Sequence, residues 1–142
     1  MTMNVNIRRA TPEDAHELHR LNEIFSGEWS NSSEGIADSL RMNDREAVYV
    51  ADVENQLVGF SCGQIFRSMC YPSPYAEITE LFVSEEYRRQ GIGRRLMEHM
   101  EADLRKRGVN HFHILTLEKN ISAQALYRSL GYKETSEILL EK

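Results

Sequence analysis

Apolar and polar positions alternate with two different periods along this chain of 142 residues. In the segments 47–53 and 57–66 the period is two, and Glu54-Asn55-Gln56 separates the two runs. This pattern predicts two antiparallel strands joined as a hairpin. From Ile92 to Leu104 an apolar residue instead recurs at every fourth position, with charged residues around the rest. That spacing predicts an amphipathic helix whose apolar stripe faces the core.

The remaining segments complete a mixed order of strands and helices. Thr11-Pro12-Glu13-Asp14 supplies a helix start, so we expect a helix that runs to about Phe25. Weaker patterns predict helices at 33–42 and 122–130 and strands at 5–10, 111–117 and 132–140, with another strand beginning at Glu77. The predicted order is β-α-α-β-β-β-α-β-α-β. The expected fold class is therefore α/β (α+β), with residues 1–142 as one domain that has a mixed, mostly antiparallel central sheet and helices on both faces.

Composition and charge narrow the function classes. The formal net charge of −5 argues against nucleic acid as a partner, because phosphate backbones attract basic domains. The chain has no run of roughly 18 apolar residues and no apolar segment of a signal peptide at its start, so we expect a cytoplasmic protein with no membrane partner. Cys62 and Cys70 form no metal-binding or disulfide pattern, so no structural metal is expected.

One turn concentrates positive charge inside this acidic chain. Arg88-Arg89-Gln90-Gly91-Ile92-Gly93 lies between the strand that begins at Glu77 and the helix that follows, and Arg94 and Arg95 come next. Glycines and a helix N-terminus together predict an anion site, with phosphate as its natural guest. The spacing is not that of a P-loop, and Leu96 occupies the third glycine position of a dinucleotide fingerprint. The alternative is a tight turn with solvated arginines.

Two blocks of the sequence resemble those of the GNAT acetyltransferase superfamily. The turn Arg88–Gly93 is similar to the acetyl-CoA-binding signature, in which Gln or Arg precedes two residues, Gly, one residue, and Gly or Ala. The run Asn120–Tyr127, followed by Leu130-Gly131-Tyr132, is similar to the second block of that superfamily. The resemblance is clear from about Glu77 to Tyr132. It implies a GNAT-like sheet and transfer of an acetyl group from acetyl-CoA to an amine.

The resemblance also implies which residues bind the cofactor and which donate a proton. The pyrophosphate would lie on the Arg88–Gly93 turn, and the pantetheine would run beside the strand that contains Glu80. Tyr127 resembles the tyrosine that protonates the leaving thiolate, although a core tyrosine is the alternative. The cofactor-binding residues implied in this way are Leu81, Phe82, Val83, Arg88, Arg89, Gln90, Gly91, Ile92, Gly93, Arg94, Asn120, Ala123 and Tyr127.

Glu80 is the first choice for the general base. A protonated amine has no lone pair, so a carboxylate must remove a proton directly or through water. Strict alternation would place Ile78 and Phe82 on the same face as Glu80, which would bury it partly and favour this role. Glu77 is the weaker choice. Thr79 stands where many relatives place the acid, and a β-bulge in this strand would change which side chain faces the cleft.

The remaining chemistry needs no covalent intermediate. Backbone N–H groups in 81–83 would stabilise the oxyanion, and neither cysteine has the context of a nucleophile, so we expect direct transfer in a ternary complex. His111 and His113 occupy alternate positions of one predicted strand and would therefore face the same side. They could act together as a base or metal pair, and the alternative is that they are surface histidines. No metal cofactor is expected.

The acceptor is predicted to be a small cationic amine, of the aminoglycoside, polyamine or amino-acid type. The substrate-binding candidates are aromatic and acidic residues, because such groups receive cations: Glu28, Trp29, Tyr71, Tyr75 and Glu77. The alternatives are a protein or peptide N-acetyltransferase, a non-catalytic acyl-CoA-binding module, and a nucleotide-binding enzyme. The C-terminus is short for the usual final pair of strands, which leaves room for a strand from a second subunit, as in a homodimer.

Overall fold

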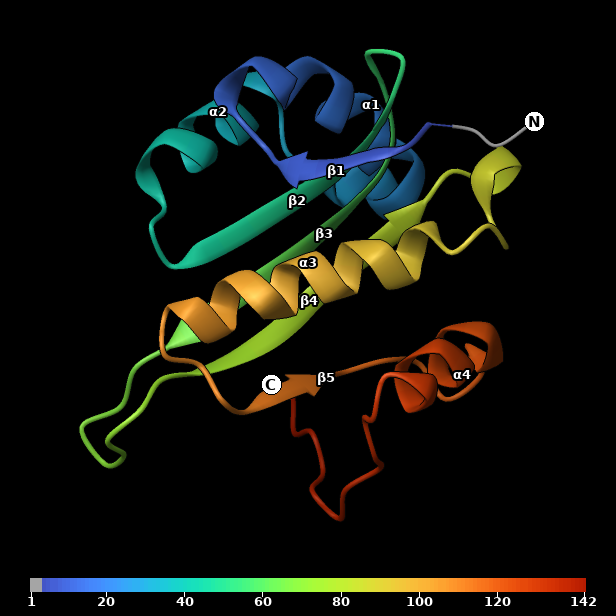
Figure 1. Cartoon of the computed structure of the whole chain (residues 1–142). Coiled ribbons are helices and arrows are strands. Elements are labelled where there is room, and N and C mark those ends of the chain that lie inside the picture. The colour runs from blue at the N-terminus through green and yellow to red at the C-terminus, as the bar shows by residue number, and fades with distance from the viewer. Residues whose placement is uncertain (1–3) are drawn as a thin grey trace.

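The computed structural model describes residues 4–142 and contains a five-stranded sheet in the order β1-β2-β3-β4-β5 (Figure 1). The first four strands are antiparallel to their neighbours, and β5 is parallel to β4. The mixed, mostly antiparallel sheet is therefore confirmed. The strands are β1 (Asn6–Arg9), β2 (Glu46–Val53), β3 (Gln56–Phe66), β4 (Tyr75–Val83) and β5 (Phe112–Ile114).

Helices cover both faces of this sheet, as predicted. On one face, α1 (Ala15–Ser26) buries Leu18 and Leu21 against β2, β3 and β4, and α2 (Ser33–Met42) packs beside it. The opposite face is covered by α3 (Ile92–Lys106) (Figure 1). The last helix is α4 (Ile121–Ser129). Among residues 4–142, no helix is long and apolar enough to cross a membrane.

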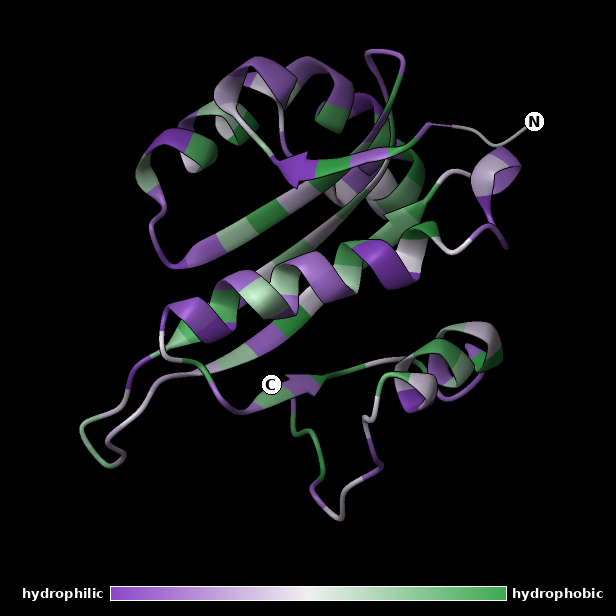
Figure 2. Cartoon of the chain, viewed as in Figure 1, coloured by the Kyte–Doolittle hydropathy of each residue, from purple (hydrophilic) through white to green (hydrophobic). Residues whose placement is uncertain are grey.

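The apolar stripe of α3 is the centre of the core. Its members at every fourth position from Ile92 to Leu104 are all buried, as predicted, and Met97 beside them is buried as well. Met97, Met100 and Leu104 pack against strand residues such as Ile78. Charged residues alternate with this stripe along the helix (Figure 2). The residues on this face of the sheet are therefore structural.

The C-terminal part of the chain differs from the prediction. The segment 132–140 forms no strand, and β5 spans only Phe112–Ile114 instead of 111–117. The side chains of Ile138, Leu139 and Leu140 are exposed. A strand is stable only where it has a hydrogen-bonded neighbour and an apolar face to cover, and this tail has neither in the described chain. The observed order is therefore β-α-α-β-β-β-α-β-α.

Candidate active site

The turn before α3 has the backbone geometry of an anion site. Arg89 and Gly91 adopt positive φ angles of 65° and 79°, which lead the chain into the helix at Ile92. The first N–H groups of a helix have no acceptor within it, and its N-terminus carries partial positive charge. No acidic residue lies in the first turn of α3 to balance that charge. An external anion would therefore be stabilised here.

The four arginines near this turn do not act alike. Arg88 donates from Nε to the Val83 carbonyl oxygen at 2.8 Å, and Arg94 donates to Ser129 Oγ at 2.5 Å. Arg95 donates to the Val5 carbonyl oxygen at 3.0 Å. Within residues 4–142, Arg89 has no side-chain hydrogen bond or ion pair. Arg88, Arg94 and Arg95 are thus hydrogen-bonded within the protein, and the turn offers mainly its backbone and Arg89 to an anion.

Gly93 has a packing role. A Cβ atom at this position would lie 3.4 Å from Leu126 Cδ2 of α4, which is tighter than most such contacts. The side chains of Leu81 and Val83 lie just beyond, at 3.8 Å and 3.9 Å. The second glycine of the turn therefore allows α3, α4 and β4 to approach one another.

Strands β4 and β5 separate in the middle of β4. Their pairing covers Ala76 with Phe112 through Ile78 with Ile114, and β4 then continues to Val83 without β5 beside it. The backbone of Leu81–Val83 thus lies on an open strand edge, where the outward-facing N–H and C=O groups are available to a ligand, except the Val83 carbonyl oxygen, which accepts from Arg88. The predicted roles of these residues in binding pantetheine and the oxyanion stay predictions with a suitable geometry.

On the α4 side of this opening, Asn120 occupies the N-cap position but its side chain makes no capping hydrogen bond. Ala123 is half-buried in the first turn. Tyr127 is half-buried against the α3 core cluster, and its ring lies 6.3 Å from that of Tyr132. Burial raises the pKa of Tyr127, so its hydroxyl is protonated at neutral pH and can act as a donor.

The prediction that both Ile78 and Phe82 share the face of Glu80 is wrong, because β4 contains a bulge. Cys62 of β3 pairs with Glu80, whereas the next residue of β3, Gly63, pairs with Ile78, so Thr79 is an extra residue. Ile78 consequently packs in the α3 cluster and Phe82 in the α1 cluster, on opposite faces. Glu80 shares only the face of Phe82. Thr79 donates its hydroxyl to Glu80 Oε2 and to the Cys62 carbonyl oxygen.

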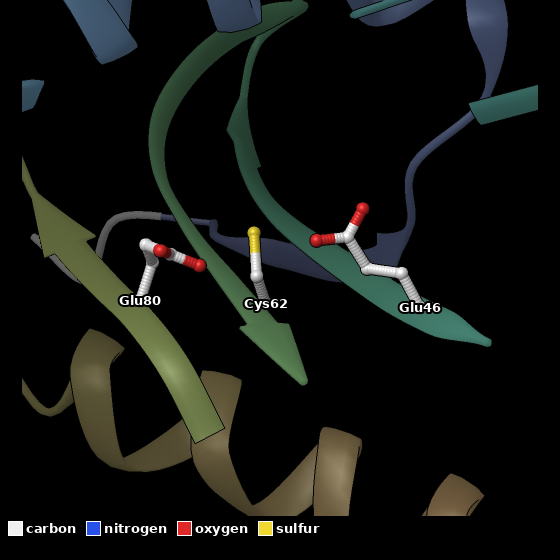
Figure 3. Close-up of side chains that lie close together, drawn as sticks. All are labelled: Glu46, Cys62 and Glu80. Carbon is white, nitrogen blue, oxygen red and sulfur yellow. The ribbon is translucent and has the colours of Figure 1, made fainter. Parts of the chain in front are cut away.

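Glu80 belongs to a compact group on three neighbouring strands. Oxygens of Glu46 and Glu80 and the sulfur of Cys62 lie within 4.8 Å of one another, and the three side chains point to the same side of the sheet (Figure 3). Burial, followed by the charge of Glu80, raises the pKa of Glu46. Burial and both carboxylates raise the pKa of the Cys62 thiol, so it stays protonated and is a poor nucleophile. The sequence analysis did not find Glu46.

The five predicted acceptor residues do not all lie on one surface. Glu77 pairs with Gln64, which also pairs with Glu46, and Tyr75 pairs with Phe66. Glu77 and Tyr75 therefore share the face of Cys62 and Glu80. By contrast, the remaining candidates are exposed on other segments: Glu28 and Trp29 in the link between α1 and α2, and Tyr71 in the β3–β4 loop.

The two histidines lie at the same end of the sheet. His113 Nε2 is 3.9 Å from Glu77 Oε1, and the rings of His111 and His113 are 5.8 Å apart. In the described chain, the one group whose ligand atoms are close enough for a metal ion is Glu46, Cys62 and Glu80, without either histidine.

Sequence comparison places these features among acetyltransferases. Residues 14–132 match the acetyltransferase (GNAT) family. An uncharacterised N-acetyltransferase of Chlorobaculum tepidum is 36% identical over 131 residues, which cover 90% of this chain and 75% of that protein. The ribosomal protein bS18-alanine N-acetyltransferase of Escherichia coli K12 is 41% identical over 61 residues, or 43% of this chain and 41% of that enzyme.

Structure comparison agrees on the fold. The aminoglycoside N-acetyltransferase AAC(6')-Iy in complex with CoA superposes with a TM-score of 0.87 at 18% identity, and the match covers 100% of this chain and 96% of that one. A similarity at this identity shows the fold, whereas the family match and the Chlorobaculum relative show descent. The chain therefore belongs to the acetyltransferase (GNAT) family and is an acyltransferase of the N-acetyltransferase type.

Proposed function

We propose that residues 1–142 act as one N-acetyltransferase domain that transfers the acetyl group of acetyl-CoA directly to a primary amine of a small cationic acceptor. The observation that carries this proposal is the position of Glu80 and Glu46 on one side of β4, beside the edge that β5 leaves open. Tyr127 and the anion-binding turn lie on the other side. Donor and acceptor would meet at that edge.

The cofactor would follow the geometry of the turn and the open edge. Its pyrophosphate would accept hydrogen bonds from the N–H groups at the start of α3, with Arg89 nearby. The pantetheine amides would pair with the free backbone of Leu81–Val83, as a short added strand would. Asn120 and Ala123 would line the other side of the arm, because the Asn120 side chain has no capping bond. This path ends with the thioester near Tyr127.

The transfer then needs three groups. Glu80 takes a proton from the acceptor ammonium, and the free amine attacks the thioester carbonyl carbon. A backbone N–H of Leu81–Val83 stabilises the oxyanion of the tetrahedral intermediate. When the C–S bond breaks, Tyr127 donates its proton to the thiolate of CoA. The nitrogen then loses a second proton, which through solvent replaces the one that Tyr127 gave up, and Glu80 releases the first proton to solvent. Each turnover therefore yields the amide, CoA thiol and one proton.

The acceptor class follows from charge. Two half-buried carboxylates that have no Lys, Arg or His nitrogen within 4.0 Å among residues 4–142 favour an ammonium, as in polyamines, aminoglycosides or amino-acid-like amines. A protein or peptide N-terminus is the second candidate, since the Escherichia coli relative is named for a ribosomal protein. A non-catalytic acyl-CoA-binding module would keep the turn but would not use Glu80 or Tyr127.

A screen of amines with acetyl-CoA, read by release of CoA thiol, tests this function. The panel should contain diamines, polyamines, aminoglycosides, amino acids and a peptide that begins with alanine. We expect turnover with small cationic amines, and turnover with the peptide alone would favour the protein acceptor. Calorimetry with acetyl-CoA, CoA and ATP separates binding from catalysis. Tighter binding of ATP than of CoA would contradict the proposal.

We also propose that the protein is a cytoplasmic homodimer. The exposed side chains of Ile138, Leu139 and Leu140 and the unpaired outer edge of β5 support a second copy as the partner. Light scattering of the chain with and without residues 134–142 tests this assembly. A monomeric intact chain would contradict it.

A further inference from the structure

A polar row crosses four strands on the sheet face that carries Glu80. Glu46, Gln64, Glu77 and His113 are paired directly with one another in this order across β2, β3, β4 and β5. Glu80 and Cys62 form the next row, towards α1. The opposite face at this level is apolar core against α3, including Ala47, Ile65 and Ala76. The sheet therefore presents a half-buried acidic surface on one side only.

Glu46 is held in place on this surface and lacks a counter-ion. Gln64 Nε2 donates to Glu46 Oε2 at 3.1 Å, and Ser39 of α2 lines the same small hollow as Glu46. Within residues 4–142, no Lys, Arg or His nitrogen lies within 4.0 Å of Glu46 or Glu80. Two carboxylates at such a short separation repel each other, so a cation between or beside them would stabilise the pair.

A small hollow adjoins Glu46 where α2 crosses β1 and β2. Its volume is about 30 Å³, and its lining includes Ser39, Asn43, Val48 and Glu46. A water molecule occupies about 30 Å³ in the liquid, so the hollow has room for one ammonium-sized group. Arg9 also lines it, but this side chain is exposed and its charge is screened by solvent. The hollow therefore gives access to Glu46 from the side of β1, and neither Cys62 nor Glu80 lines it.

We propose that Glu46 is a specificity-determining residue, whose carboxylate binds a second ammonium group of the acceptor while Glu80 takes a proton from the first. This inference rests on the acetyl transfer proposed above and adds the substrate class, a diamine with a short spacer. An extended three-carbon chain places its terminal nitrogens about 5 Å apart. A chain of this length can reach both carboxylates at once, because oxygens of Glu46 and Glu80 lie no more than 4.8 Å apart.

The ionisation of Glu46 links this selectivity to pH. Burial and the charge of Glu80 raise its pKa, and Cys62 and Arg9 are the other titratable groups that face it. The charged form binds the second ammonium. The preference for a diamine must therefore increase as the pH rises and Glu46 loses its proton, until the diamine itself begins to deprotonate.

The test compares 1,3-diaminopropane with propylamine, which has the same length and one amino group. We expect the wild type to show the higher kcat/KM with the diamine, and Glu46→Gln to lower the ratio of the two values about tenfold, as loss of a charge-assisted contact does. The ratio should rise with pH above the usual titration range of a carboxylate in the wild type, because the pKa of Glu46 is raised, and it should stay flat in Glu46→Gln. Glu98→Gln is the matched control, because Glu98 is exposed on α3, across the sheet.

Calorimetry of 1,3-diaminopropane with the CoA-saturated protein gives a second readout that needs no turnover. Weaker binding to Glu46→Gln, with acetyl-CoA affinity unchanged and a Tm no lower than that of the wild type, would support the inference. Equal ratios in the wild type and Glu46→Gln would overturn it and leave the acetyl transfer intact. Absence of turnover with any amine would instead refute the transfer. Zinc binding that disappears in Cys62→Ser, without any effect of Glu46→Gln on selectivity, would also overturn the inference in favour of a metal site.

Discussion

The two sides of β4 build their binding surfaces from different parts of the chain. On the side of α3 and α4, the anion turn and the open strand edge expose backbone groups, and three of the four nearby arginines are hydrogen-bonded to Val83, Ser129 and Val5. On the side of α1 and α2, the surface consists of side chains such as Glu46 and Glu80. A backbone surface tolerates many sequences, whereas a side-chain surface changes with each substitution. The cofactor side is thus suited to one shared donor and the acceptor side to a particular amine.

Removing the proposed base is the strongest way to test the acceptor side. Glu80→Gln should lower kcat at about pH 7 by roughly 10²–10³-fold, the usual contribution of general base catalysis. The deficit should shrink at high pH, where the amine is already deprotonated. Rates of CoA release over a range of pH measure this, with acetyl-CoA affinity as the control. A deficit of the same size at every pH would remove Glu80 from the role of base.

Tyr127→Phe tests the donor group on the other side of β4. Because burial raises the pKa of Tyr127, the hydroxyl is protonated and its loss should lower kcat by about 10–100-fold. The affinity for acetyl-CoA, measured by calorimetry, should stay nearly unchanged, since the ring still packs in the core. Tyr132→Phe is a matched control, because its hydroxyl donates to Glu101 instead. Unchanged turnover in Tyr127→Phe would exclude the tyrosine as the donor.

A pair of arginine variants would show how far the cofactor side depends on side chains. Arg89→Ala should weaken acetyl-CoA binding about threefold to tenfold and reduce its salt dependence, because Arg89 has no internal partner in the described chain. Arg94→Ala should have a smaller effect on the same dissociation constant, because that guanidinium is bonded to Ser129. The reverse order would mean that the Arg94 side chain leaves Ser129 to meet the ligand.

The smallest expected effect concerns stability on the acceptor side. The pKa of Glu46 is raised in the folded protein, so the folded protein holds a proton on this carboxylate more tightly than the unfolded chain does. The resulting stabilisation of the fold is fully present below the pKa that Glu46 has in the unfolded chain. It is lost as the pH rises through the pKa that Glu46 has in the folded protein. Glu46→Gln should therefore raise Tm by about 1–3 °C at neutral pH and by less near pH 4. A lower Tm for the variant at pH 7, measured by calorimetric scans, would contradict this reasoning.

The sequence was informative where structure depends on local pattern. The stripe of α3, the hairpin and the glycine turn all follow from spacing and residue type, and the structure confirms them. The tail was misassigned because a strand needs a neighbour, and local propensity does not reveal whether one exists. Tyr127 was identified by resemblance to a family block, and its catalytic role stays a prediction.

The acceptor face could not be read from the sequence because two bulges set its register. One lies between Ala51 and Asp52 of β2, and the other involves Thr79 of β4. If β2 and β3 paired regularly from the hairpin turn outward, Glu46 would lie opposite Gly63. Because of the bulge it lies opposite Gln64 instead, whose side chain is on the other face of the sheet from that of Gly63. A one-residue shift moves every side chain to the opposite face. The proximity of Glu46 and Glu80 therefore appears only in three dimensions.

The polar row across the four strands has a consequence for how such enzymes diverge. Glu46, Gln64, Glu77 and His113 are only half-buried, and the core that stabilises the domain lies behind them against α3. Substitutions in this row would alter the charge and shape of the surface without opening a cavity in that core, and core cavities are one cause of large losses of stability. After a gene duplication, one copy would be free to drift towards a new amine while its donor chemistry stays intact.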